Sequence, residues 1–229
     1  MQIVGHRGGR ELATENTLKA IKAGIKAGAD AIEIDLRLSA DNYFTVQHDP
    51  GFITPQGQTT LIARQSYKKI LSCLPDMPSL GQVTKTVLTN HTKHELFLDC
   101  KDRHFARELS LFFDSLKKQG YDTTRIIVLS FYARELAAFK KMQPAARIYY
   151  LFRYGLFFHL LICKYIGAEG AGYNWRYTLK PLPWLCHRHR LKIYYYTVNK
   201  SRLANIFKRR GVDYLATDRP DTIREALDI

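Results

Sequence analysis

The segment Glu33–Pro50 reads "EIDLRLSADNYFTVQHDP" and contains two patterns from which the fold is predicted. Glu33 and Asp35 are the polar members of an apolar run, "AIEIDL", and His48 ends a second β-like run, "YFTVQH". Because successive side chains of a strand point to opposite faces, Glu33 and Asp35 point the same way and the apolar residues between them point the other way. This indicates a strand of a covered sheet that carries carboxylates into a polar site.

Similar β-like runs alternate with helical patterns along the whole chain. Most of the runs are apolar throughout, which is typical of parallel strands covered on both faces. Each helical pattern has Lys or Gly in or just after its last turn, as helices commonly do. The runs expected to be strands are 2–6, 31–36, 43–48, 95–100, 125–130, 146–151, 170–173, 191–198 and 212–217. The helical patterns lie at 15–28, 104–120, 133–142 and 201–211.

Eight or so β/α units in 229 residues predict a single (β/α)8 TIM barrel, one domain over 1–229, with only a short insertion after the third strand. The chain has neither a GxGxxG turn that opens a helix nor a Walker lysine, which argues against the dinucleotide-binding and P-loop classes. Its N-terminus shows no secretory signal, and its four cysteines form no CxxC pair. We therefore expect a reduced, cytoplasmic protein without disulfides or zinc.

The charge of the chain is unevenly distributed. From Arg134 to Arg210 there are sixteen Lys and Arg against two acids, Glu135 and Glu169, so this segment alone accounts for the net charge of +14. Such a balance favours an anionic partner, either nucleic acid, an anionic membrane surface or a phosphorylated substrate. A basic surface that serves only solubility explains it equally well.

The apolar segment 151–166, "LFRYGLFFHLLICKYI", has two interpretations. It is too short to span a bilayer and contains Arg153, His159 and Lys164, which argues against a transmembrane helix. The favoured interpretation is a barrel helix that packs a broad apolar face on the sheet. The alternative is an interfacial helix that contacts lipid while basic residues attract anionic headgroups, which would make the protein peripheral to a membrane.

Polar residues fall at the carboxyl ends of the first four predicted strands, where the functional groups of TIM barrels cluster. They are His6 and Arg7, Glu33 and Asp35, His48, and Asp99 followed by Lys101. Three carboxylates in one barrel mouth repel each other unless a cation lies between them, and such hard ligands suit Mg²⁺ or Ca²⁺. With two histidines to transfer protons and two cationic side chains to neutralise phosphate, the set predicts a site for an anionic ester.

Other polar groups are weaker candidates. "HTKHE" at 91–95 precedes a predicted strand and so lies at the wrong end of a barrel. "HRHR" at 187–190 is expected to be an exposed basic turn, and Ser130 lacks a nucleophile elbow around it.

Over nearly its whole length the sequence resembles the glycerophosphodiester phosphodiesterase family. The motifs that carry the resemblance occur in the order of the family. They are "GHRGG" (5–9), "ENT" (15–17), "GADAIEIDLRLSADNYFTVQHD" (28–49), "MPSLGQV" (77–83), "LFLDCK" (96–101), "IVLSF" (127–131), "YTVN" (196–199) and "GVDYLATDRP" (211–220). The resemblance implies a TIM barrel that hydrolyses glycerophosphodiesters to glycerol 3-phosphate and an alcohol, with one divalent cation, Mg²⁺ or Ca²⁺.

The resemblance also implies a role for each residue that matches a family motif. His6 and His48 correspond to the acid/base pair, Glu33, Asp35 and Asp99 to metal ligands, Arg7 and Lys101 to phosphate contacts, and Glu15 and Tyr196 to supporting residues. Two positions depart from the family. Asp99 stands where glutamate is usual, which retracts the carboxylate by ~1.5 Å, and Tyr196 stands where tryptophan is usual.

The hypothesis is therefore metal-assisted cleavage of a phosphodiester, in which His6 removes a proton from the attacking hydroxyl or water and His48 protonates the leaving alcohol. One alternative is a lipid headgroup hydrolase of lysophospholipase D or sphingomyelinase D type, with a lysophospholipid substrate. The other is a non-enzymatic basic barrel that binds a membrane or nucleic acid. The full set of acids and histidines argues against this non-enzymatic alternative, and a nucleic-acid partner is not expected.

Overall fold

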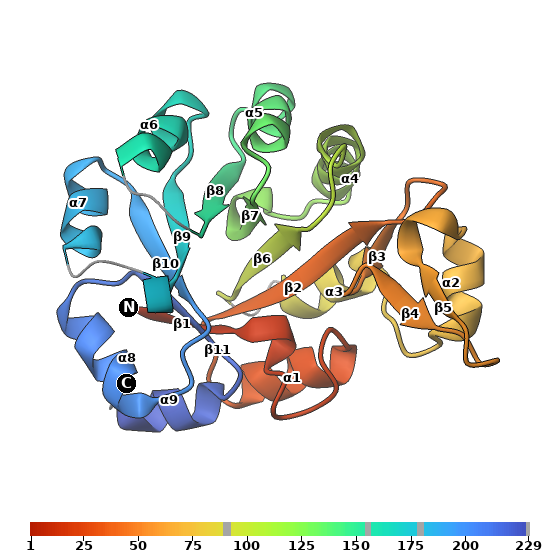
Figure 1. The fold of residues 1–229 in the computed structure, drawn as a ribbon, viewed down its shortest axis with the longest axis horizontal. Helices are drawn as coiled ribbons and strands as arrows, with labels where there is room; N and C mark the ends of the chain where they lie inside the picture. Colours follow the sequence, from red (N-terminus) through yellow and green to blue (C-terminus); the bar gives the residue numbers. More distant parts are fainter. Residues whose placement is uncertain (89–92, 154–156, 178–180, 228–229) are drawn as a thin grey trace.

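Eight parallel strands close into a barrel in the structure, a computed structural model that describes residues 1–227 except 89–92, 154–156 and 178–180 (Figure 1). Neighbouring strands follow the order β1-β11-β10-β9-β8-β7-β6-β2, and pairing of Val4 with Ala31 closes the ring. The barrel strands are β1 Gln2–Gly5, β2 Ala31–Leu38, β6 Glu95–Cys100, β7 Ile126–Ser130, β8 Arg147–Phe152, β9 Gly170–Asn174, β10 Lys192–Tyr196 and β11 Tyr214–Thr217. The predicted TIM barrel is confirmed.

The predicted strand at 43–48 is not part of the barrel. Its core, β3 (Phe44–Val46), runs antiparallel to the outer end of β2, with Leu36 opposite Val46. The eight-residue β2 extends beyond its neighbours, so the returning chain can pair with it after a turn in which Asn42 has φ of 62°. The short insertion therefore follows the second barrel strand, not the third.

The insertion forms a small lobe beside the barrel, on the right of Figure 1. After β3 it contains the hairpin β4 (Gly51–Ile53) and β5 (Thr59–Leu61), then η2 (Ile62–Arg64) and α2 (Tyr67–Cys73). The chain returns to the barrel through α3 (Leu80–Val87), whose first turn is closed by reciprocal hydrogen bonds between Ser79 and Gln82.

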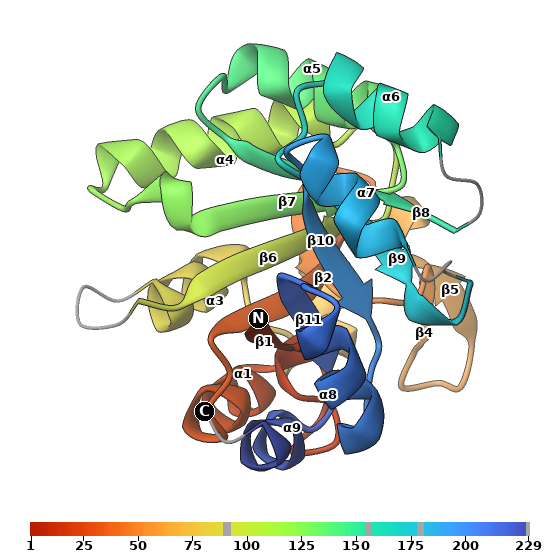
Figure 2. The same ribbon diagram turned by 90° about the vertical axis from the view of Figure 1, so that its left-hand side faces the viewer.

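Helices cover the outside of the barrel (Figure 2). The four predicted helical patterns are confirmed as α1 Leu18–Lys26, α4 Ala106–Lys118, α5 Ala133–Met142 and α8 Ser201–Arg209. The prediction did not include α2, α3, α7 (Leu182–Arg188) or α9 (Pro220–Ala226). These are seven or eight residues long, too short for a clear periodic pattern.

The apolar segment at 151–166 divides between two elements. Residues 151–152 end β8, and α6 (Phe157–Tyr165) packs on β8 and β9, as expected for a barrel helix. Within the described ranges, none of the helices combines the length and the apolar character that crossing a bilayer requires.

Aromatic rings fill the inside of the barrel below the mouth. Phe97 is fully buried and stacks on Tyr194 at 5.4 Å between ring centres, with Tyr214 and Tyr149 edge-on at 5.0 and 6.1 Å. Arg147 closes the amino-terminal end of the barrel through ion pairs with Glu95 and Glu169 and a hydrogen bond to Tyr214. The interior is therefore a packed floor, and only its carboxyl-terminal end is left for a site.

Close packing of two glycines fixes the loop that follows β1. A Cβ at Gly24 in α1 would lie 2.1 Å from the carbonyl oxygen of Gly8, and a Cβ at Gly8 would lie 2.8 Å from the Ile21 nitrogen. Gly8 also has φ of 86°, which a side chain strongly disfavours. This contact holds η1 (His6–Gly8) against α1 and so positions His6 and Arg7 at the mouth.

We predict that Phe97→Ala lowers the free energy of unfolding by about 3–5 kcal/mol, because it opens a cavity among rings that cannot collapse onto it. Urea denaturation measures this loss. Leu111→Ala, on the exposed side of α4, is the control and should change stability by less than about 0.5 kcal/mol. Equal effects of the two substitutions would contradict the packed floor.

Candidate active site

A cavity of about 290 Å³ opens at the carboxyl-terminal end of the barrel. Most residues that the sequence nominated line it. They are His6, Arg7, Glu33, His48, Asp99, Lys101 and Tyr196. Asp35 is fully buried within ion-pair distance of Arg7 and Lys101, and Glu15 reaches the site through Arg7. Tertiary structure therefore brings all nine nominated residues into or against one cavity.

His48 reaches the cavity from a different element than the sequence predicted. His48 does not lie at the carboxyl end of a barrel strand, because β3 is antiparallel and outside the barrel. His48 comes instead from the turn between β3 and β4, so it belongs to the lobe. The lobe therefore brings a histidine to the mouth from outside the ring of strands.

Three carboxylates form an acidic cluster on β2 and β6. One oxygen each from Glu33, Asp35 and Asp99 lies within 4.8 Å of the others, and all three residues are buried. The parallel register pairs Asp35 directly with Asp99, and Glu33 points to the same face as Asp35. Asp99 Oδ1 is buried and accepts no hydrogen bond from the described residues.

Burial and mutual repulsion govern the ionisation of this cluster. Burial, with Asp35 and Asp99 alongside, raises the pKa of Glu33 well above its usual range. Burial likewise raises the pKa of Asp99, although Lys101 opposes the shift. Burial also disfavours the Asp35 carboxylate, but Lys101 and Arg7 outweigh it and lower the pKa of Asp35 to about 2.

These observations fit a divalent cation. All the donors are carboxylate oxygens, which Mg²⁺ and Ca²⁺ prefer. Two of the carboxyls are held where ionisation is unfavourable without more positive charge, and one buried oxygen of Asp99 has no partner in the part of the chain that the structure describes. Glu33, Asp35 and Asp99 are therefore the residues that could hold the ion.

Lys101 lies between two of these carboxylates. Its Nζ is 2.9 Å from Asp35 Oδ1 and also donates to Asp99 Oδ2. Asp35 and Asp99 raise the pKa of Lys101 despite its burial, so the side chain stays charged.

Arg7 connects the first strand to the acidic cluster. Its backbone N–H donates to Glu33 Oε2 at 2.8 Å, and its guanidinium lies 3.2 Å from Asp35 and donates to Glu15 at 2.8 Å. Arg7 has φ of 51°, a left-handed conformation that turns the backbone N–H toward Glu33. Glu15 thus acts on the cavity by orienting this guanidinium.

Asn16 is a member of the site that the sequence did not nominate. Its Nδ2 donates to Asp35 Oδ2 at 2.9 Å and its Oδ1 accepts from the Asp35 backbone N–H at 3.1 Å. The amide is buried and fixes the rotamer of Asp35. Asn16 stands in the "ENT" motif beside Glu15, which was the available signal.

Asp218 is a second member that the sequence did not nominate. Its Oδ1 lies 2.7 Å from His6 Nδ1, and its Oδ2 accepts from Asn199 Nδ2 at 2.6 Å. Asn199 in turn accepts from the Asp218 backbone N–H. When the Nδ1–H of His6 donates to Asp218, the unprotonated Nε2 is presented to the cavity. Asp218 lies in "ATDRP", directly after the last barrel strand, where functional groups of a TIM barrel are expected.

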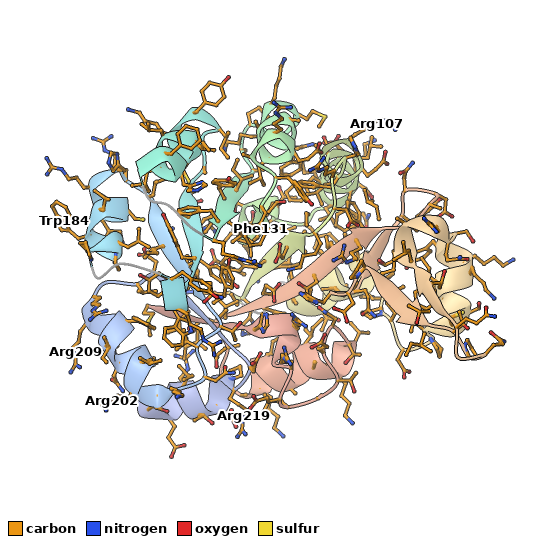
Figure 3. All side chains as sticks on the ribbon, viewed as in Figure 1. Arg107, Phe131, Trp184, Arg202, Arg209 and Arg219 are labelled. Carbon is orange, nitrogen blue, oxygen red and sulfur yellow. The ribbon has the colours of Figure 1, made fainter. Side chains whose placement is uncertain are left out.

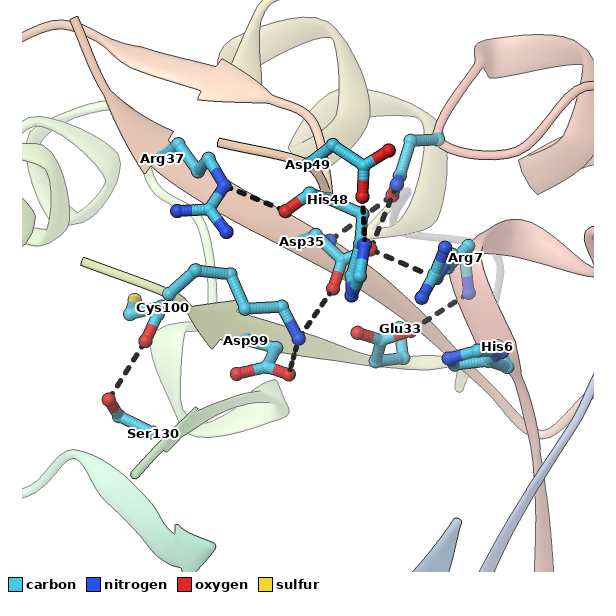
Figure 4. A network of polar contacts seen from close by, with 12 residues as sticks. His6, Arg7, Glu33, Asp35, Arg37, His48, Asp49, Asp99, Cys100 and Ser130 are labelled. Carbon is cyan, nitrogen blue, oxygen red and sulfur yellow. Dashed lines mark hydrogen bonds and ion pairs between the residues drawn. The ribbon is translucent and has the colours of Figure 1, made fainter. Parts of the chain in front are cut away.

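His48 is held differently. Its Nδ1 lies 2.8 Å from Asp49, a side chain that is 75% exposed. Its carbonyl accepts from Arg37 Nε at 2.7 Å (Figure 4), and Arg37 pairs with Asp102 at 2.6 Å. Arg37 therefore ties the backbone of the lobe to the end of β6, while the imidazole remains partly open to solvent.

The opposite wall of the cavity is largely aromatic. Phe131, Leu151, Tyr194 and Tyr196 form it, with Arg153 at the rim. Burial raises the pKa of the Tyr196 phenol, so Tyr196 lines the wall as a neutral hydroxyl.

None of the weaker candidates that the structure describes lines this cavity. His94 precedes β6 at the amino-terminal end of the barrel, and His91 falls outside the described residues. His187 pairs with Asp213 at the same end. Ser130 is buried and donates its hydroxyl proton to the Cys100 carbonyl. All four cysteines are free thiols in the structure.

The sequence is similar to those of known phosphodiesterases along most of its length. The model of the glycerophosphoryl diester phosphodiesterase family matches residues 6–56 and 55–222. A glycerophosphodiester phosphodiesterase of Caldanaerobacter subterraneus subsp. tengcongensis is 23% identical over 238 residues, which cover 96% of this chain and 95% of the relative. A putative glycerophosphodiester phosphodiesterase of Bacillus subtilis is 28% identical over 243 residues, covering 97% and 96%.

Solved structures show the same fold. A putative glycerophosphoryl diester phosphodiesterase from Silicibacter pomeroyi superposes with a TM-score of 0.86 at 19% identity, covering 100% of this chain and 93% of that chain. A phosphodiesterase from Oleispira antarctica, solved in complex with the product sn-glycerol-3-phosphate, gives a TM-score of 0.85 at 20% identity, covering 100% and 97%.

We predict that Asp218 contributes to stability in a pH-dependent way. Burial opposes its ionisation, but the hydrogen bond from His6 outweighs this and lowers the pKa of Asp218. The stabilisation is therefore present above the unfolded value, about 3.9, and is lost as the pH falls through the folded value. Asp218→Asn should cost more unfolding free energy near neutral pH than in acid.

Urea denaturation of both proteins across the acid range measures this difference. Asp76→Asn, at an exposed position near α3, is the matched control and should shift stability by a constant amount. A pH-independent effect of Asp218→Asn would count against the His6–Asp218 pair.

Proposed function

Because this chain belongs to the glycerophosphoryl diester phosphodiesterase family, we propose that it hydrolyses glycerophosphodiesters to glycerol 3-phosphate and an alcohol. The observation that carries the proposal is the convergence, in one cavity, of a buried carboxylate cluster, two cationic side chains and two histidines. The product bound by the Oleispira antarctica phosphodiesterase, which shares the fold, is consistent with this substrate class.

The substrate phosphate is expected to lie over the acidic cluster. A divalent ion held by Glu33, Asp35 and Asp99 would supply positive charge to a phosphate oxygen. Arg7 and Lys101 add charge that cannot be lost near neutral pH, because both side chains are paired with carboxylates that raise their pKa. Asn16 and Glu15 take no part in the chemistry but hold Asp35 and Arg7 in place.

His6 is suited to act as the general base. Asp218 holds its Nδ1, so Nε2 can accept the proton of the attacking hydroxyl or water as the new P–O bond forms. Asp218 also stabilises the imidazolium that results. The side chain is 13% exposed, which keeps this base close to a fixed orientation.

His48 is suited to protonate the leaving alkoxide oxygen as the old P–O bond breaks. It reaches the cavity from the lobe, and its side chain is 35% exposed, so it can exchange protons with solvent between turnovers. The proton taken by His6 and the proton given by His48 balance the reaction, and the enzyme returns to its starting state by exchange with water.

Lysophospholipids are a second candidate substrate class. The aromatic and aliphatic wall of the cavity, with Phe131 41% exposed at its edge, offers an apolar surface that a glycerophosphodiester headgroup does not require. Turnover of glycerophosphocholine compared with lysophosphatidylcholine separates the two classes. Preference for the lysolipid would assign the chain to lipid headgroup cleavage.

We predict that His6→Gln and His48→Gln each lower kcat by about 10²–10⁴-fold, since each removes one proton transfer. Release of glycerol 3-phosphate measures activity, and circular dichroism verifies the fold. His187→Gln is the matched control, because His187 is hydrogen-bonded to an aspartate outside the cavity. Near-wild-type turnover of either site variant would refute its assigned role.

We predict that a chelator abolishes turnover and that Mg²⁺ or Ca²⁺ restores it. Calorimetric titration of the chelated protein with each ion should give one site per chain, and Glu33→Gln should weaken that site by at least about tenfold. Glu225→Gln, outside the cavity, should bind like the wild type. Full activity in excess chelator would exclude the metal-assisted route.

A further inference from the structure

Exposed apolar side chains are concentrated in one part of the surface. Of the eleven large hydrophobic residues that are exposed among the described residues, five lie between 158 and 184, about an eighth of the chain. They are Phe158, Leu161, Tyr165, Tyr177 and Trp184. Single exposed apolar residues need no explanation, but a concentration of this kind marks an interaction surface.

Four of these residues form what we call the α6–α7 face: Phe158, Leu161, Tyr165 and Trp184. The first three have the i, i+3, i+7 spacing that places them on one side of α6, and they are 72%, 62% and 89% exposed. The opposite side of α6, with Leu160 and Cys163, is buried on the barrel.

Trp184 extends this face onto the next helix around the barrel. It is 62% exposed on α7 and points away from the protein, on the left of Figure 3. Figure 1 shows α6 and α7 as neighbours, because they flank β9. The four side chains are therefore presented on adjacent helices of one flank of the barrel.

Positive charge accompanies the α6–α7 face. Arg188 lies over the Trp184 ring at 5.8 Å, and Lys164 stands on α6 beside Tyr165. Between residues 157 and 188 the only acid is Glu169, and its carboxylate is paired with Arg147 and Lys192. Arg188 and Lys164 thus add positive charge beside the exposed apolar side chains, and the one acid in this stretch of sequence is already paired with basic residues.

We propose that the α6–α7 face docks this protein on an anionic lipid bilayer. Phenylalanine, leucine and tryptophan side chains enter the boundary between headgroups and acyl chains, while Arg and Lys remain at the level of the lipid phosphates. The net charge of +14 attracts such a surface from solution. Docking does not depend on the hydrolytic activity proposed above.

Charge and side-chain type favour a bilayer over a second copy of the chain and over a nucleic acid. A second copy of the chain would place one basic surface against another, which is unfavourable without intervening anions. A nucleic acid would match the positive charge and could stack on the aromatic rings. It would gain neither stacking nor charge pairing from the aliphatic side chain of Leu161. A bilayer uses both the aliphatic and the cationic residues.

Docking on this flank also has a consequence for the cavity. Phe158 lies in the first turn of α6, and α6 follows the carboxyl end of β8, so this end of the face lies toward the mouth. Arg153, at the rim of the cavity, precedes the same helix. A membrane bound along this flank would therefore come near the entrance.

Co-sedimentation with vesicles tests the proposal. The protein should bind vesicles of phosphatidylcholine mixed with phosphatidylglycerol at least about tenfold more tightly than vesicles of phosphatidylcholine alone, and raised salt should weaken the binding. The double variant Phe158→Ser/Leu161→Ser and the variant Arg188→Gln should each lose about tenfold or more in affinity for the anionic vesicles.

Matched controls lie on α4, two helices away. Leu111→Ser and Arg107→Gln replace an exposed leucine and an exposed arginine there and should bind like the wild type. Hydrolysis of a water-soluble phosphodiester should be unchanged in all four variants, which verifies that they are folded.

Any one of several results would overturn the proposal. They are equal binding to neutral and anionic vesicles, equal losses in the α4 controls, and light scattering that shows a dimer which the Phe158→Ser/Leu161→Ser variant dissociates. Tighter binding to single-stranded RNA than to anionic vesicles would likewise assign the face to a different partner.

Discussion

The repulsion among three buried carboxylates is the constraint on which the rest of the site depends. Glu33, Asp35 and Asp99 are held together by the register of β2 and β6, and burial makes their charge costly. The protein offsets that charge with Lys101 between Asp35 and Asp99 and with Arg7 on the other side. The raised pKa of Glu33 indicates that the compensation is incomplete, which is the electrostatic condition for binding a further cation.

The barrel supplies the rigidity that this arrangement needs. Phe97 and the tyrosines around it form a floor below the mouth, so the acidic residues stand on a packed layer rather than over a water-filled channel. The close approach of Gly24 to Gly8 fixes the loop that carries Arg7. Precise placement is required because a misplaced cation would leave a buried carboxylate uncompensated.

The two histidines differ in how they are held. His6 is nearly buried, and its orientation is set by Asp218 and Asn199. Asn199 lies after β10 and Asp218 directly after β11. His48 lies on the lobe, is more exposed and relies on Asp49, itself mostly in solvent. This difference suits the roles proposed above, in which His6 takes one proton inside the cavity and His48 delivers the other to a departing alcohol.

The barrel and most of the site could be predicted from the sequence, because strand periodicity is local and because the carboxyl ends of parallel strands meet at one mouth. Glu33 and Asp35 are two residues apart in a predicted strand, so their side chains point to the same face whatever the fold. Tertiary structure alone decided that residues 43–48 leave the barrel, since the length of β2 relative to its neighbours is a property of the closed sheet. It alone also joined Asp218 to His6, 212 residues apart, because no local pattern encodes which side chains meet when the last strand pairs with the first.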